Sequence, residues 1–425
     1  MRYALYAYII LIPFLHALSP IPIQSIAFFL LVAISPFVLL MRGGVPGAFA
    51  KQDLCLFVTL VSGFVAWWFY GVPIEEDRFQ GGAQWLSSII FSLIIVRKLI
   101  VVSRVTVEDI GRAACISVMI LSFSILADFY LANFEGTRLS DIIPYSVDEF
   151  PKAEILGLFQ RPRGLTVEAG FNGIIYECLG PFVVYYFTKN RNVLSLAALS
   201  AMALGVLMIF SLSTIFSVAV AISLLFLIKS RSFFSLLFVL VFVPSLLYLA
   251  LSTQFLFDLF GYKIAEFLDI ANYNVYGVGR QGSFFFGIQL ALDNMLGIGW
   301  GTVLQEASIP GTMIDYNLDG GSLISLWLEL LVATGIVGFL FFFYVFFKNI
   351  KGLADNHDRA SSFIFVSLTA VSLHHIFVYD LWFPMIWFSL AVAQVALSRR
   401  HGPYFRSSEG GTPANSSTTQ AEASA

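Results

Sequence analysis

About twelve apolar stretches dominate this chain of 425 residues, and each approaches the length of a membrane span. A helix that crosses the hydrocarbon core of a bilayer needs ~20 mostly apolar residues. The chain is 58% hydrophobic and only 12% charged, which is too little charge to cover a water-soluble surface. We therefore predict an all-α integral membrane protein with about twelve spans, near residues 3–18, 21–41, 52–71, 83–102, 110–132, 166–187, 193–210, 212–228, 232–251, 321–347, 361–379 and 382–397.

The apolar stretch from Val193 to Ile228 is too long for one span. As a single helix it would measure about 54 Å, whereas the bilayer core is ~30 Å thick. Basic segments at 189–192 and 229–232 flank it on both sides, and basic loops favour the cytoplasm. We therefore predict two spans joined by an outer turn at 211–214.

Basic residues also orient the whole chain. Twelve spans with a cytoplasmic N-terminus place most of the 24 lysines and arginines inside. We expect the first apolar stretch to be retained, because it lacks a small-residue cleavage site and leads directly into the second. Seven basic residues are then left on the outer side: Arg78, Arg138, Lys152, Arg161, Arg163, Lys263 and Arg280.

Two long outer segments, near 133–165 and 252–320, carry all of these except Arg78. Connections of this length are usually functional or disordered, and their aromatic and amphipathic content predicts that they are folded. The membrane domain is expected to cover residues 1–400. The remaining 401–425 are rich in Ser, Thr, Gly and Glu, which predicts a disordered cytoplasmic tail.

Several classes of protein are excluded by missing motifs. The chain has neither a Gly-rich phosphate loop ending in Gly-Lys-Ser/Thr nor a Gly-x-Gly-x-x-Gly sequence after a strand, so an internal nucleotide motor is not expected. Cys55, Cys115 and Cys178 all fall in apolar stretches, which argues against a disulfide framework or a metal cluster. We expect no metal, no cofactor and no nucleic-acid partner.

The first candidate site is the segment from Arg161 to Gly173, which leads from the first long outer loop into the sixth span. Its proline and glycines predict a fixed loop shape, and arginine pairs are well suited to phosphate oxygens. Thr166 and Glu168 are placed to cap the incoming helix. The alternative is structural, with Glu168 as a cap and the arginines as headgroup anchors.

The second candidate site begins at Arg280, which opens an amphipathic stretch at 283–296 that predicts an interfacial helix. The glycine-rich turn at 297–301 follows, and its glycines permit a tight backbone that approaches a ligand. The alternative for Arg280 is a simple lipid anchor. Three acids lie further along this outer segment as solvated charges, hydroxyl ligands or a general base: Glu306, Asp315 and Asp319.

Ionisable residues inside predicted spans are functional candidates, because burying them in a bilayer is costly. Asp128, His374 and His375 lie near the outer ends of their spans, where we expect water to reach them. Glu177 and Glu329 lie deeper, where a paired structural role and a proton pathway both remain open.

The order of these motifs resembles the O-antigen ligase and Wzy-type polysaccharide polymerase superfamily. An R-x-x-G pattern enters a central span at 161–164, and an arginine at 280 precedes an amphipathic helix. An N-P-L-G-x-G-x-G-like turn follows at 294–301, and a G-I-V-G-F run lies in the next span at 335–339. The number of spans and the large outer loop agree, so the resemblance covers about residues 50–397.

This resemblance implies a metal-independent glycosyltransferase of the GT-C type in the bacterial inner membrane, with cytoplasmic termini and two large periplasmic loops. Its substrates would be undecaprenyl-diphosphate-linked oligosaccharides, and its implied partners are a flippase and a chain-length-regulating copolymerase. A diphosphate leaving group requires fixed positive charge. The implied site consists of Arg163, Arg280 and Glu168 as catalytic groups, with Arg161, Asn172, Asp315 and Asp319 as substrate-binding groups.

One departure from the ligases favours a polymerase. Ligases of this superfamily place a histidine in the large loop before the tenth span, and residues 252–320 contain none. A ligase remains the nearest alternative, because a carboxylate in that loop, His374 or His375 could serve as the base. A transporter or flippase is the alternative from another class; it is supported by Glu177, Glu329 and the number of spans, but we find no internal two-fold repeat.

Overall fold

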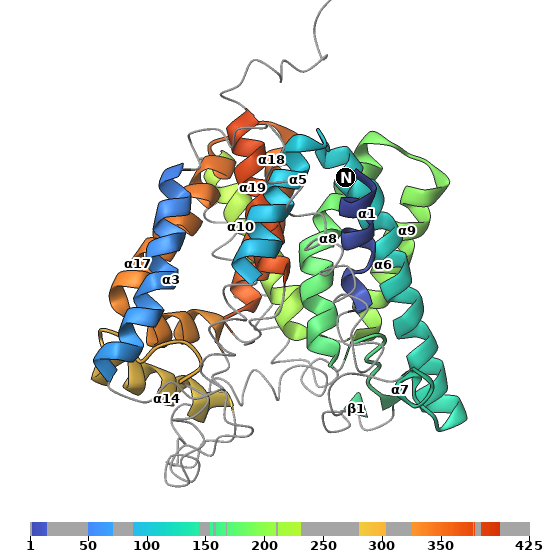
Figure 1. Ribbon diagram of the computed structural model, residues 1–425. Coiled ribbons are helices and arrows are strands. Elements are labelled where there is room, and N and C mark those ends of the chain that lie inside the picture. Colours follow the sequence, from blue (N-terminus) through green and yellow to red (C-terminus); the bar gives the residue numbers. More distant parts are fainter. Residues whose placement is uncertain are drawn as a thin grey trace, which may run out of the picture.

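The computed structural model describes residues 2–14, 50–70, 88–143, 154–155, 159–166, 168–209, 211–230, 280–302, 325–376, 378 and 384–399. These residues form a bundle of helices (Figure 1). In chain order the elements are α1 (Arg2–Ile10), the 3₁₀-helix η1 (Ile12–Phe14), α3 (Ala50–Tyr70), the π-helix η2 (Ser88–Ile95), α5 (Val96–Val102), α6 (Val107–Tyr130), the π-helix η3 (Leu131–Glu135), α7 (Leu139–Ile142), β1 (Glu154–Ile155), β2 (Phe159–Gln160), α8 (Ala169–Lys189), α9 (Val193–Ile209), α10 (Leu212–Ser230), α14 (Arg280–Asp293), α17 (Leu326–Ala354), α18 (Arg359–His374) and α19 (Pro384–Arg399).

The helices have the apolar character of a membrane protein. Within the part of the chain that the structure describes, three helical segments are long and apolar enough to cross a membrane, at Lys51–Tyr70, Val107–Glu135 and Leu326–Ala354. Shorter apolar helices accompany them. This agrees with the predicted all-α membrane protein, while the number of twelve spans stays a prediction. The predicted spans at 21–41 and 232–251 lie outside the described residues.

The predicted division of the 193–228 stretch is confirmed. α9 ends at Ile209 and α10 begins at Leu212, so a short turn separates two helices. Ser211 precedes α10, and its hydroxyl accepts hydrogen bonds from the backbone N–H of Thr214 (3.4 Å) and from the Thr214 hydroxyl (3.0 Å). Polar side chains thus satisfy groups that a helix start leaves without an intrahelical partner.

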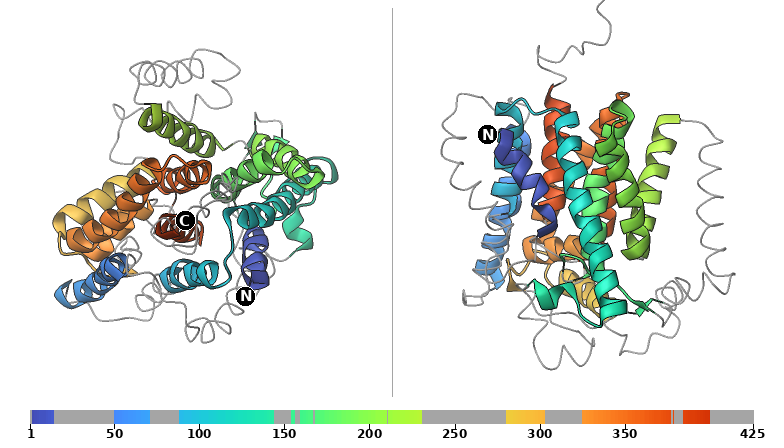
Figure 2. Two further views of the ribbon diagram at one scale, coloured as in Figure 1. Left: turned by 90° about the horizontal axis from the view of Figure 1, so that it is seen from above. Right: turned by 90° about the vertical axis from the view of Figure 1, so that its right-hand side faces the viewer.

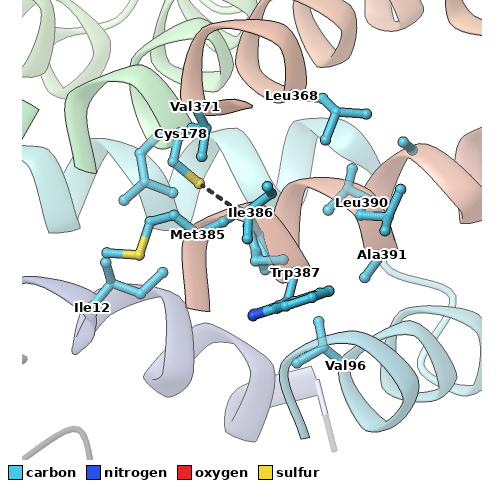
Figure 3. Close-up of a cluster of buried hydrophobic side chains, with 14 of the residues drawn as sticks. Ile12, Val96, Cys178, Leu368, Val371, Met385, Ile386, Trp387, Leu390 and Ala391 are labelled. Atoms are coloured by element: carbon cyan, nitrogen blue, oxygen red, sulfur yellow. Dashed lines mark hydrogen bonds between the residues drawn. The ribbon is translucent and has the colours of Figure 1, made fainter. Parts of the chain in front are cut away.

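Helix α8 lies at the centre of the arrangement. It packs against α6, α9, α10 and α18, while α3 packs along α17 at the opposite side of the bundle. Helices α18 and α19 lie between α8 and the pair formed by α3 and α17 (Figure 2). In the interior, the thiol of Cys178 donates to the backbone oxygen of Met385 at 3.8 Å, within the buried cluster that also contains Val371 and Trp387 (Figure 3). Cys178 therefore acts as a buried packing residue.

A buried polar network joins four helices at one end of the bundle. Arg97 of α5 donates to Asp53 of α3 at 2.9 Å and to Gln394 of α19 at 2.7 Å. Gln52 of α3 accepts from Gln394 (2.7 Å) and from Asn349 of α17 (3.0 Å). The network brings together the start of α3 and the ends of α17 and α19, which the predicted topology also places on one side.

The glycine-rich turn after α14 packs onto a break in α17. Gly335 has a backbone conformation (φ 64°, ψ −178°) that interrupts the helix. The backbone N–H groups of Ile298 and Gly299 donate to Val332 and Ala333 at 2.9 and 3.0 Å. In the described residues, Gly297 permits a close contact with the backbone of α17, whereas a Cβ atom at Gly299 would meet the Trp67 side chain; the expected approach of this turn to a ligand stays a prediction. The turn and the G-I-V-G-F run are therefore two halves of one packing motif.

This contact predicts a large effect of Gly335→Ala. A Cβ atom at this position would lie 2.4 Å from the backbone carbon of Leu296, and the conformation itself is almost restricted to glycine. We expect the free energy of unfolding to fall by about 1–2 kcal/mol from backbone strain, with a further ~1–3 kcal/mol from overpacking. The measurement is the fraction of detergent-solubilised protein that still elutes as a monodisperse species after heating.

Gly136→Ala is the matched control, because Gly136 also has a positive φ (69°) but a Cβ atom there would meet nothing within 4 Å. This variant should show only the strain contribution. Equal heat resistance of the two variants would contradict the proposed backbone contact.

Candidate functional site

The loop that carries Arg161 and Arg163 lies at the end of the bundle that also holds α7, β1 and α14 (Figure 1). Its centre is buried, and only 6% of Arg163 is exposed. Asp128, near the end of α6, accepts hydrogen bonds from the backbone N–H groups of Arg163 (2.6 Å) and Gly164 (3.3 Å). Gly164 has a φ of 62°, and a Cβ atom there would lie 2.8 Å from the Ser124 hydroxyl. The loop is thus fixed against α6.

The same carboxylate also anchors α7. Its Oδ1 accepts from the backbone N–H of Leu139 at 2.9 Å, and Arg138 lies 3.9 Å away as an ion-pair partner. Arg138 in turn donates to the side chain of Gln160 at 2.8 Å. We expected water to reach Asp128, but it is 1% exposed. Sequence reasoning missed its role, because the bonds are made to backbone groups far along the chain.

Asn172 supports the loop from within α8. It is fully buried, its Nδ2 donates to the backbone oxygen of Arg163 at 2.7 Å, and its Oδ1 accepts from the Thr166 hydroxyl at 3.0 Å. Thr166 is also within 2.7 Å of the backbone oxygen of Glu168. The predicted contact of Asn172 with substrate is not tested by these bonds, but its position shows how the arginine loop keeps its shape.

Glu168 occupies the position before the first turn of α8, as predicted, but its side chain makes no capping hydrogen bond. The Thr166 side chain is directed into the loop instead. The interpretation of these residues as a conventional helix cap is therefore wrong. Glu168 is partly exposed, and one of its carboxylate oxygens lies 3.5 Å from the Cβ position of Gly170. Its carboxylate is accessible from the same end as the arginines.

Arg161 connects the loop to the turn between α9 and α10. Its Nε donates to the backbone oxygen of Ile209 at 2.6 Å, where α9 ends. This contact brings the first long outer segment next to the polar turn that contains Ser211, Ser213 and Thr214. The arginine loop and the turn between α9 and α10, which were predicted separately from the sequence, are therefore in contact.

A chain of three polar side chains begins at this turn. The hydroxyl of Ser213 lies 3.1 Å from Nε2 of His374, and Nδ1 of His374 lies 2.6 Å from Oε1 of Glu177. The three residues come from α10, α18 and α8. His374 and Glu177 are fully buried, whereas Ser213 is partly exposed. The expectation that water reaches His374 and His375 is wrong, because both imidazoles are 0% exposed.

Gly173 makes room for this cluster. A Cβ atom at that position would lie 1.8 Å from the Thr214 hydroxyl and 3.4 Å from Cε1 of His374. Thr214 also interacts with the carboxyl group of Glu177. The last glycine of the predicted arginine motif therefore allows α8, α10 and α18 to approach closely. No pattern in the sequence joins Glu177 to His374, since the two residues lie 197 positions apart in the chain.

The structure describes only some of the other predicted site residues. Arg280 is the first residue of α14, and only its backbone is described. Asp315, Asp319 and Glu306 lie outside the described residues. Glu329 of α17 is 3% exposed, and Nδ1 of His375 donates to the backbone oxygen of Val371 at 2.7 Å. Within the described ranges, no group of three or more His, Cys, Asp and Glu side chains is arranged to hold a metal ion.

Comparison with known proteins gives no relative for this chain. No protein-family model matches it, and no curated protein is similar to it at a significant level. A function must therefore be argued from the motifs and from the geometry of the site.

The anchoring role of Asp128 leads to a prediction about Asp128→Ala. Without this carboxylate, two buried backbone N–H groups of the arginine loop lose their acceptor, and each unsatisfied group costs ~1–3 kcal/mol. We expect the loop to open and the Arg163–Gly164 bond to become a trypsin site in the purified protein. Cleavage can be mapped by mass spectrometry of the fragments.

Asp141→Ala serves as the control, because Asp141 accepts a backbone hydrogen bond from Arg138 at 2.6 Å within α7. That variant removes a nearby carboxylate without touching the arginine loop, so the Arg163–Gly164 bond should stay protected. Protection of this bond in Asp128→Ala as well would show that Asp128 does not fix the loop.

Proposed function

We propose that this chain is a metal-independent membrane glycosyltransferase that joins lipid-diphosphate-linked oligosaccharide repeats into a polysaccharide. In this proposal it has about twelve spans of the GT-C type and lies in the bacterial inner membrane, with both termini in the cytoplasm. The observation that carries the proposal is the arginine loop itself. Arg161 and Arg163 belong to a hydrogen-bonded loop at one end of the bundle, next to a polar turn in which Ser213 is partly exposed.

The rigidity of this loop supports a role in charge stabilisation. When a glycosidic bond to a diphosphate breaks, negative charge grows on the leaving oxygen, and preorganised positive groups stabilise it without reorganising. Arginine suits this task because its guanidinium group is always charged and binds two oxygens at once. In the proposal Arg163 and Arg280 bind the diphosphate, Arg161 assists, and Glu168 positions Arg163 or the acceptor.

The end of the bundle on which these groups lie also supports the proposal. The arginine loop, α7 and α14, which begins at Arg280, share one end (Figure 1), and the side view in Figure 2 places α7 and α14 at that end too. A flippase would deliver the lipid-linked repeats to this side, and a chain-length-regulating copolymerase would act on the product. Asp315 and Asp319 remain proposed contacts to the sugar.

A ligase that transfers finished glycan to an acceptor is the second candidate. The observation that favours it is the placement of His374, which the structure connects through Ser213 to the polar turn beside Arg161. The two functions differ in what accumulates when the gene is deleted. A lost polymerase leaves single lipid-linked repeats, whereas a lost ligase leaves long lipid-linked polymer that is never transferred.

The main prediction concerns Arg163→Ala and Arg280→Ala. Each variant is expressed in a strain that lacks the chromosomal gene, and its glycan is examined by gel for polymer length and yield. We expect each to lose at least ~100-fold in polymer formation, which is the usual cost of removing one preorganised donor to a developing oxyanion. Arg163→Lys should recover part of the loss, because the charge returns without the planar fork.

Arg191→Ala is the matched control, since Arg191 is an exposed arginine between α8 and α9 at the opposite end of the bundle. It should form polymer normally. If Arg163→Ala and Arg280→Ala both kept normal polymer length and yield at normal protein level, the proposed function would be wrong.

A further inference from the structure

The Ser213, His374 and Glu177 side chains form an ordered chain that runs from a partly exposed hydroxyl to a buried carboxyl group. We infer that this chain is a proton relay for the proposed glycosyl transfer, with His374 as the group that finally accepts the proton of the acceptor hydroxyl. The inference rests on the proposed function and adds to it the base, which the arginine motifs leave open.

The hydrogen bonds give the relay a direction. In the proposed relay Glu177 is ionised and accepts only, so Nδ1 of His374 carries the proton and donates it across the 2.6 Å contact. Nε2 then carries a lone pair and accepts from the Ser213 hydroxyl at 3.1 Å. A base oriented by a third group and bonded to a hydroxyl is the general arrangement of an activated oxygen nucleophile.

The exposure of these three side chains determines which of them can contact a substrate. His374 and Glu177 are fully buried, and Ser213 is the partly exposed member of the three. The Ser213 hydroxyl also lies 3.0 Å from that of Ser211, and the same turn follows Ile209, whose backbone oxygen binds Arg161. The relay therefore opens beside the arginine loop, on the side where the donor diphosphate is proposed to bind.

A purely structural bridge between helices is the alternative, and the molecule itself shows what such a bridge looks like. At the other end of the bundle, α3, α5, α17 and α19 are joined by the amides of Gln52, Asn349 and Gln394 and by the ion pair of Arg97 with Asp53. Its amides and guanidinium group do not take up and release protons, whereas an imidazole does so near neutral pH. A His–Glu pair that ends at an accessible hydroxyl fits proton transfer better than helix packing.

In the proposed glycosyl transfer, the acceptor oxygen forms a bond to the anomeric carbon. The bond from that carbon to the diphosphate oxygen breaks, and its electron pair goes to the diphosphate. The acceptor proton moves to the Ser213 oxygen, and the original Ser213 proton moves to Nε2 of His374. The imidazolium is then paired with Glu177, and it returns the proton through Ser213 to water.

The test uses full-length purified protein and the lipid-linked repeat extracted from the deletion strain, which serves as donor and acceptor. Ser213→Ala, His374→Gln and Glu177→Gln should each lower kcat by about 100-fold or more, the usual contribution of general base catalysis. KM should change little, because the arginines that bind the diphosphate are untouched. Ser213→Thr keeps the hydroxyl and should retain most of the turnover.

Ser217→Ala is the control, since Ser217 lies one turn further along α10, is fully buried, and its hydroxyl has no hydrogen-bond partner among the described residues. It should behave as wild type. Wild-type kcat in Ser213→Ala and Glu177→Gln, with turnover lost in Arg163→Ala, would overturn the relay and leave the proposed function standing. Wild-type turnover in Ser213→Ala and Glu177→Gln, and also in both Arg163→Ala and Arg280→Ala, would overturn both the relay and the proposed function. Covalent labelling of Ser213 by a fluorophosphonate would make it a nucleophile and would also overturn the relay.

Discussion

One buried carboxylate, Asp128, holds the functional end of this molecule together. Its two oxygens accept backbone N–H groups from Arg163, Gly164 and Leu139, so one side chain of α6 binds both the arginine loop and the start of α7. Backbone groups cannot stay unpaired in an apolar interior, and loops there persist only when protein groups satisfy them. The arginine loop can be buried and still keep a fixed shape because this acceptor, together with Asn172, replaces water.

The bundle has a polar layer at each end and an apolar interior between them. One layer is built from Arg97, Asp53 and neutral amides, and the other from Asp128, Arg138 and the arginine loop. Between them, residues such as Met385 and Trp387 pack in a mostly apolar interior, in which the Cys178 thiol donates to a backbone oxygen (Figure 3). This arrangement fixes the axial position of the helices that contribute to the two layers. Such a helix would lose its polar partners if it moved along its axis by one turn.

Much of the fold could be predicted because hydrophobic length and basic flanks are local properties of the sequence. The division of the 193–228 stretch and the helix that begins at Arg280 are examples. The functional contacts could not be predicted in this way. Asp128 meets Arg163 and Glu177 meets His374 only after the helices pack, and a single sequence carries no signal for such pairs. The glycines at 297–301 were predicted to permit a close backbone approach, and Gly297 makes one with the backbone at Gly335, whereas Gly299 lies against the Trp67 side chain.

The break at Gly335 also has a mechanical consequence. The first part of α17 gives its backbone oxygens at Val332 and Ala333 to the turn after α14, and its first N–H, at Leu326, donates to the backbone oxygen of His375. This short segment therefore links the turn after α14, which begins at Arg280, to the end of α18, which ends at His374. In the proposed function, a tilt of α14 on binding the lipid carrier would be transmitted through these hydrogen bonds to the end of α18, so lipid binding and the position of the His374 imidazole would change together.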